Sequence, residues 1–175
     1  WLVDNCLTLN LDKCHFVVFR RMQRRFVGPF QTVFINEVML KQTHNTKFLG
    51  VLIDGNLNWD LHIASIVRKL SKFIPILFNI RNSISKETLS LIYNCMIYPN
   101  LTYCNHVWGG SCDRFIDPLT KLQKKLIRII SHKPRLEHTE TLSLFKSFNI
   151  LNVNKIINRQ PSLICSHSSL KNTRF

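Results

Sequence analysis

The spacing of hydrophobic residues changes near residue 56 of the chain. Before that point, apolar residues stand in short runs bounded by Gly, Pro, Asn and Asp, which is typical of strands joined by turns. We expect strands over 11–19, 32–35, 38–41 and 48–53, with Asn36 and Glu37 at the tip of a hairpin. Gly50 lies inside the last strand, where a glycine usually marks a bulge or a close backbone approach. Residues 1–9 are predicted to be the end of an amphipathic helix.

From residue 57 the apolar residues recur at the three- and four-residue spacing of helices. Asn58 or Asp60 can cap the first helix, and Pro75 is expected to kink it because proline removes one backbone hydrogen bond. A second helix is predicted to begin at Ser85 as N-cap and to end before Pro99. Residues 100–108 add a further turn or two.

The clearest helical pattern covers 115–131. Its apolar residues share one face, and Gln123 projects to the same side, where it needs a hydrogen-bond partner. The opposite face carries four cations, which are Lys121, Lys124, Lys125 and Arg128. Shorter helices are expected over 139–145 and 151–158, and 161–175 is predicted to be a flexible polar tail. The predicted fold class is therefore α+β, with a small antiparallel sheet followed by a mostly α-helical bundle.

The net charge is +14, from 24 Lys and Arg against 10 Asp and Glu, and it is the strongest indication of function in the composition. A protein this basic attracts phosphate backbones or anionic membranes. A basic helix face is often only a solvated surface, but the charge of the whole chain favours a polyanion as its partner. A second basic cluster is formed by Arg20, Arg21, Arg24 and Arg25.

Residues 89–112 contain no Asp, Glu, Lys or Arg, yet Asn94, Asn100 and Asn105 would be costly to bury in lipid. A buried hairpin of helices explains this stretch better than a membrane span. The six cysteines are irregularly spaced and no secretory signal precedes them, so we expect reduced thiols and an intracellular location, cytoplasmic or nuclear. The start at Trp1 suggests that the natural beginning of the protein is missing.

Two possible metal sites are weak. Asp54, Asn56, Asn58 and Asp60 alternate like calcium ligands, but Trp59 stands where a calcium loop needs glycine. A zinc site is disfavoured because its four candidate ligands lack paired spacing; they are Cys104, His106, Cys112 and His132. Nucleotide-binding glycine motifs and the adjacent carboxylates of two-metal phosphoryl transfer are also missing from the sequence. The residues alone indicate no catalytic centre and no metal site.

An ordered series of residues across about 1–151 resembles the reverse transcriptases (RNA-directed DNA polymerases) of non-LTR, LINE- and jockey-like retrotransposons. The matching positions are Trp1, Asn5, 7–10, Lys13, Cys14, 47–51, Asp54, Leu57, Trp59, His62, Ile63, 91–93, 97–99, 101–104, 107–109, 122–125 and 127–130. His167, Thr173 and Arg174 resemble a later element of the family, after a stretch that is shorter than usual.

The resemblance implies that 1–56 is the end of the polymerase palm, 57–160 a helical thumb-like domain and 161–175 a tail. It implies that Lys13 lies near the phosphates of the incoming nucleotide, where an ammonium can assist the leaving oxyanion. Phe48, Leu49 and Gly50 match the family's primer-grip element. The resemblance also implies that nucleic acid, as a template–primer, contacts basic residues of the thumb; these are Arg68, Lys72, Lys121, Lys124, Lys125 and Arg128.

The family's metal-binding aspartates, including its Tyr-x-Asp-Asp pair, belong upstream of Trp1. We therefore expect no cofactor in this chain, Mg²⁺ in the intact enzyme, and no polymerase activity from this piece without the missing palm and fingers. Two alternatives stay open. One is a non-catalytic, nucleic-acid-binding relic, and the other is a basic helical module that binds a protein.

Overall fold

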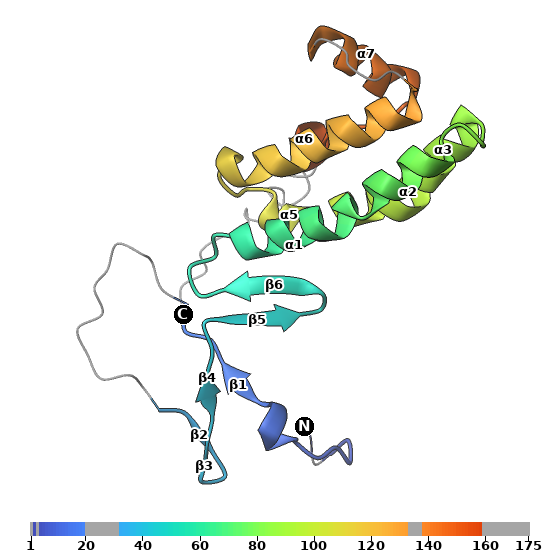
Figure 1. Cartoon of the computed structure of the whole chain (residues 1–175). Coiled ribbons are helices and arrows are strands. Elements are labelled where there is room, and N and C mark those ends of the chain that lie inside the picture. The colour runs from blue at the N-terminus through green and yellow to red at the C-terminus, as the bar shows by residue number, and fades with distance from the viewer. Residues whose placement is uncertain (1, 3, 20–31, 133–137, 159–175) are drawn as a thin grey trace, which may run out of the picture. The chain divides into compact units, whose positions relative to one another are not determined.

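The computed structural model describes residues 2, 4–19, 32–132 and 138–158. The predicted basic cluster at residues 20–25 and the predicted tail at 161–175 lie outside these residues. The chain forms two compact units, Trp1–Leu61 and His62–Phe175, drawn in Figure 1. The first holds all six strands of the described residues, and helices dominate the second, which confirms the α+β prediction.

The strands of the first unit form three separate pairs. β1 (His15–Phe16) pairs in parallel with β4 (Lys41–Gln42), whereas β2 (Phe34–Ile35) pairs antiparallel with β3 (Val38–Met39), and β5 (Asn45–Phe48) with β6 (Val51–Asp54). The expectation of one antiparallel sheet is therefore wrong, because ladders of two to four residues end before they can join. The helix predicted for 1–9 is also wrong, since the described residues there form turns before a short 3₁₀ helix, η1 (Leu11–Lys13).

Two tight turns close the antiparallel hairpins. Asn36 (φ 47°) and Glu37 (φ 64°) join β2 to β3, as predicted, and Leu49 (φ 45°) with Gly50 (φ 85°) joins β5 to β6. Consecutive residues with positive φ match the twist of a two-residue hairpin loop. The predicted strand over 48–53 is wrong for this reason: Gly50 reverses the chain rather than interrupting a strand.

The Asp54 carboxylate organises the loop that follows β6. It accepts hydrogen bonds from the backbone N–H groups of Asn56 (2.9 Å), Asn58 (3.1 Å) and Trp59 (3.2 Å). This is an extended version of the turn that Asp side chains commonly stabilise. The carboxylate that headed the alternating calcium-like series is thus used to hold the backbone at the start of the first helix.

The second unit consists of helices packed around one apolar core (Figure 1). They are α1 (Asp60–Ser71), α2 (Phe73–Ile80), α3 (Lys86–Ile92), the π-helix η2 (Tyr93–Ile97), α4 (Tyr98–Thr102), α5 (Asn105–Trp108), α6 (Asp113–Ile130), α7 (His138–Ser147) and α8 (Val153–Asn158). Leu70, Leu77, Trp108 and Leu126 are at most 1% exposed and form its centre. α2 packs directly against α6, which also contacts α7 and α8.

Two prolines act differently in these helices. Pro75 breaks the first predicted helix as expected, since α1 ends at Ser71 and α2 restarts at Phe73. The prediction that the second helix ends before Pro99 is wrong. The wide π turn of η2 precedes it and places Pro99 at the start of α4, where a missing N–H is tolerated. The Asn100 side chain donates to the Met96 carbonyl (2.6 Å) and satisfies this turn further.

Gln123 is the polar centre of the core and is 1% exposed. Its Nε2 donates to the Tyr93 hydroxyl (2.8 Å) and to the Leu151 carbonyl (2.8 Å), and its Oε1 accepts from the Val153 N–H (2.9 Å). The predicted need for a partner on the apolar side is confirmed. Three bonds from one side chain join α6 to η2 and to the start of α8.

Candidate nucleic-acid interface

The α6 basic face consists of Lys121, Lys124, Lys125 and Arg128. It lies opposite the residues that α6 buries, among them Leu119, Leu126 and Ile130, which are 0% exposed. Lys121 and Lys125 are exposed and stand one turn apart, a rise of about 6 Å along the helix. No acidic residue occurs between Pro118 and His132, so Lys125 has no acidic residue within one turn on α6, whereas Lys121 follows Asp117 by one turn.

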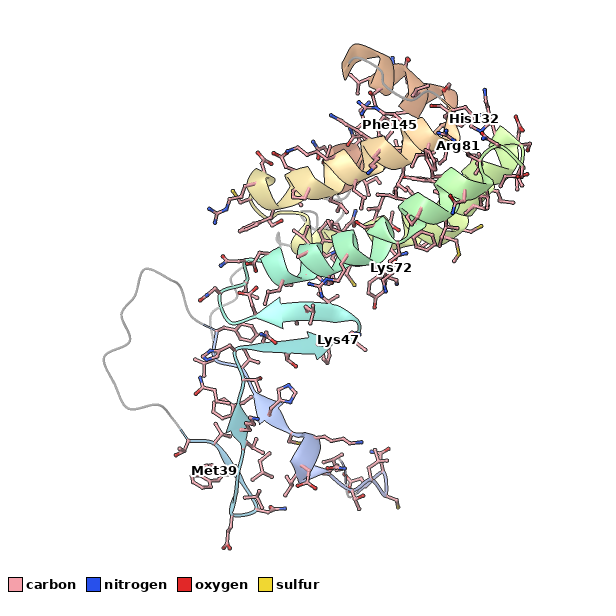
Figure 2. All side chains as sticks on the ribbon, viewed as in Figure 1. Met39, Lys47, Lys72, Arg81, His132 and Phe145 are labelled. Carbon is pink, nitrogen blue, oxygen red and sulfur yellow. The ribbon has the colours of Figure 1, made fainter. Side chains whose placement is uncertain are left out.

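The α6 basic face is less open at its C-terminal end. Lys124 and Arg128 are half-buried, and the Arg128 Nη2 donates to the Thr141 hydroxyl (3.2 Å) of α7. α7 lies near this end of α6 in Figure 1 and contacts it, and its Phe145, labelled in Figure 2, is buried. Arg128 therefore holds α7 in place, and the exposed charge of the face is concentrated at Lys121 and Lys125.

Arg114 extends the α6 face and was missed by the sequence analysis. It lies seven residues before Lys121, which is two helical turns, and its guanidinium stacks over the Phe115 ring at 4.5 Å. Asp117, also exposed, stands between them on the same side of the helix. The acid-free part of the face therefore begins at Lys121.

The structure does not join Arg68 and Lys72 to the α6 basic face. Both are exposed on α1 and at its junction with α2, on the side opposite the buried Ile66 and Leu70. Figure 2 shows Lys72 on the side of α1 and α2 that is turned away from α6. The six predicted nucleic-acid-binding residues therefore divide into two groups on different sides of the helical unit.

The predicted site residues of the first unit lie on its surface. Lys13 is exposed at the end of η1, and Phe48 (63% exposed) and Leu49 (74% exposed) stand at the tip of the β5–β6 hairpin. His15 Nε2 and the Thr46 hydroxyl are 2.6 Å apart, a hydrogen bond between β1 and β5. The segment that carries Lys13 is thus tied directly to the hairpin.

The ends of α2 and α6 are linked by His132. Its Nε2 donates to the Arg81 carbonyl (2.8 Å), and the two residues lie side by side in Figure 2. One of the two ring nitrogens of His132 is thus engaged with the backbone. Across residues 2, 4–19, 32–132 and 138–158, no three His, Cys, Asp or Glu side chains lie close enough to hold a metal ion.

Burial shifts two titratable groups in the helical core. It lowers the pKa of His62, which is 4% exposed and meets the Trp108 ring edge-on at 5.9 Å between centroids. Burial also raises the pKa of the Tyr93 hydroxyl well above its usual value, so Tyr93 stays protonated against Gln123. Both groups belong to the core rather than to a reactive site.

The sequence predicts that no segment spans a membrane and that the cysteines are reduced. Within the described part of the chain, no helix combines the length and the apolar character needed to cross a bilayer. Cys6, Cys14, Cys95, Cys104 and Cys112 are free thiols.

Comparison with curated proteins gives three relatives of one kind. The chain is 32% identical over 137 residues to an RNA-directed DNA polymerase from mobile element jockey of Drosophila funebris, covering 77% of this chain and 14% of that protein. It is 32% identical over 126 residues (70% and 13%) to a probable RNA-directed DNA polymerase from transposon X-element of Drosophila melanogaster. It is 26% identical over 141 residues (77% and 14%) to the jockey polymerase of Drosophila melanogaster.

The chain thus spans 13–14% of the length of these relatives. No family model matches it, and no solved structure matches it.

Proposed function

Since the chain belongs to the RNA-directed DNA polymerases of jockey-like non-LTR retrotransposons, we propose that it forms a part of such a polymerase that grips the template–primer. In this proposal the second unit is the thumb and the first is the end of the palm. The chemistry of nucleotide addition belongs to other parts of the polymerase.

The α6 basic face carries the proposal. Lys121 and Lys125 are exposed and one turn apart; Asp117 lies one turn before Lys121 on this side of α6, and no acidic residue follows it up to His132. Like charges at this spacing repel one another, and a phosphate backbone relieves that repulsion. Long lysine side chains also reach phosphates without needing a fixed geometry, which suits contacts that do not depend on base sequence.

The β5–β6 hairpin supports a second contact. Its tip exposes the Phe48 and Leu49 side chains together with the backbone of Gly50. An apolar tip of this kind can pack against a sugar or a base, and a turn glycine lets the backbone come close to it. We assign the hairpin to primer grip and Lys13, held beside it through His15 and Thr46, to the phosphates of the incoming nucleotide.

The first unit is proposed to be covered by the rest of the polymerase. Among its described residues, Leu40 and Val51 are the buried large hydrophobic residues, whereas Phe34, Val38 and Met39 are 46–62% exposed. So little buried apolar surface favours completion by further palm residues. The described residues contain no cluster that fits Mg²⁺, so we assign the metal to those other parts and expect no primer extension by this chain alone.

Binding of a short RNA–DNA duplex, measured by fluorescence anisotropy at several salt concentrations, tests the proposal. Changing Lys121 and Lys125 together to Gln is expected to weaken binding. It should also lower the log–log salt slope by about 2, or ~0.9 for each phosphate that the variant no longer neutralises. Arg128 is left intact because it is bonded to Thr141.

The matched control changes Lys86 and Lys155 to Gln. Both are exposed, on α3 and α8, and the control removes the same charge. Equal slopes for the two variants would remove the α6 basic face from the interface. Binding that hardly responds to salt in the unaltered chain would favour the alternative of a module that binds a protein.

A further inference from the structure

We infer that the helical unit carries a second nucleic-acid-binding surface, the α1 basic face, which consists of Arg68, Lys69 and Lys72. It is separate from the α6 basic face, so one chain can hold two nucleic-acid segments at the same time. The choice of nucleic acid as ligand rests on the proposed function, but the existence of the surface rests on the residues below.

All three side chains of the α1 basic face are exposed. Arg68 and Lys72 stand one turn apart, and Lys69, three residues before Lys72, is the other helical neighbour of Lys72. From Leu61 to Ser85 the chain contains four cations and no Asp or Glu. α1 begins with Asp60, eight residues before Arg68, whereas on α6 Asp117 stands only four residues before Lys121. The nearest acidic residue along the helix is therefore farther from the cations on α1.

The core separates the two basic faces. α1 buries Ile63, Ile66 and Leu70 on the side opposite its cations, and α6 buries Leu119, Leu126 and Ile130 in the same way. α2, which continues α1, packs on α6, and Lys72 points away from that contact in Figure 2. Two packed helices with side chains span about 20 Å, or roughly two Debye lengths at physiological salt. Charges on the two faces are therefore screened from each other, and each face needs its own ligand.

An anionic membrane is the competing polyanion. A helix that lies in a membrane surface needs a continuous apolar stripe beside its cations. On α1 and α2 the exposed large apolar residues are Leu61 (47%), Ile76 (51%) and Phe78 (52%); Leu61 precedes the basic face, the other two follow it, and Phe78 lies under the Arg81 guanidinium. The cations fill the space between them, which favours phosphates of nucleic acid.

A bridging experiment with the full chain tests the inference. One RNA–DNA duplex is fixed on beads, the chain is added at low salt, and capture of a second, fluorescent duplex is measured. Sedimentation with excess duplex gives the stoichiometry in solution. The unaltered chain is expected to capture the second duplex and to bind two duplexes per chain.

The variant R68Q/K69Q/K72Q is expected to bind one duplex per chain and to lose at least nine-tenths of the bridging signal. The double variant K86Q/K155Q is the control and should keep both. A stoichiometry of one for the unaltered chain, or bridging by R68Q/K69Q/K72Q at the unaltered level, would overturn the inference.

Two further outcomes separate the hypotheses. If K121Q/K125Q retains both bound duplexes while R68Q/K69Q/K72Q loses one, the proposed role of the α6 basic face fails and the α1 surface stands. If R68Q/K69Q/K72Q keeps both duplexes but loses flotation with vesicles that contain anionic lipid, the α1 basic face is a membrane surface and the inference is wrong.

Discussion

Replacing Gln123 by Leu is expected to destabilise the helical unit strongly, although it places an apolar residue in an apolar core. The side chains have similar sizes, so the main change is the loss of three hydrogen bonds. The Leu151 carbonyl, the Val153 N–H and the Tyr93 hydroxyl all lose their bond to Gln123. Leu151 precedes α8 and Val153 begins it, so the substitution also weakens the attachment of that helix.

The size of the effect follows from the burial of these groups. A buried polar group left without a partner costs about 1–3 kcal/mol. The added apolar surface of Leu returns about 1–2 kcal/mol. With three groups left without a partner, the net expectation is a loss of about 3–5 kcal/mol, which is a large share of the roughly 5–15 kcal/mol that stabilises a typical domain.

Urea unfolding of the full chain, followed by helical circular dichroism, measures this loss. Tyr93→Phe is a graded comparison, because Gln123 keeps its bond to the Leu151 carbonyl and the expected loss is about 1 kcal/mol. Lys125→Leu, on the exposed face of the same helix, is the control and should change stability by less than about 0.5 kcal/mol. An unfolding free energy for Gln123→Leu equal to that of the unaltered chain would refute the reasoning.

Three other perturbations follow from the same structure. Burial lowers the pKa of His62 below its usual 6.5, so the stability that neutral His62 contributes is complete above pH 6.5 and declines below it. The urea concentration at the unfolding midpoint should therefore decrease as the pH is lowered from 7 to 5, and a constant midpoint would contradict this. Gly109→Ala places a Cβ against the Asn105 carbonyl and 3.0 Å from the Ile157 Cγ2, so we expect a loss of about 1–3 kcal/mol in the same assay. An unchanged midpoint would contradict this close packing. Leu49→Asn suits the positive φ of the β5–β6 turn and should slow amide hydrogen exchange in both strands, whereas faster exchange would contradict the assigned turn.

The helices could be predicted from the sequence where a long apolar period dominates. α6 was expected over 115–131 and runs over Asp113–Ile130, because its apolar residues return to the same face over the whole length. The interruption of the helix at Pro75 could also be predicted, since the missing N–H of proline is a property of that residue alone. Pro99 was not, because the π turn that accommodates it depends on the packing of Tyr93 and Ile97 in the core.

The strands could be predicted less well. Five apolar residues over 48–53 resemble a strand, yet Leu49 adopts a left-handed conformation that leucine disfavours. Leu49 takes this conformation because β5 pairs with β6 on either side of the turn. The pairing extends to Asn45 opposite Asp54, which lie outside the apolar run. Local propensity does not predict this turn, because the turn residues are set by which residues of β5 and β6 pair with each other.

The sequence predicts which cations share a helix face, but it does not predict which of them stay exposed after the helices pack. Helical spacing correctly set Lys121 and Lys125 opposite the core, and extending it back two turns would have found Arg114. The bond between Arg128 and Thr141 depends on where α7 packs, which spacing does not show. Lys69 was not predicted, although the acid-free segment around it is visible in the sequence.

Lysine footprinting tests most directly whether the α6 basic face touches nucleic acid. The chain is treated with a lysine-modifying reagent with and without saturating RNA–DNA duplex, and modification at each lysine is read by peptide mass spectrometry. We expect Lys121 and Lys125 to be protected by the duplex, while Lys86 and Lys155, which are also exposed, react as before. Equal modification of Lys121 and Lys125 in the free and the fully bound chain would contradict the account.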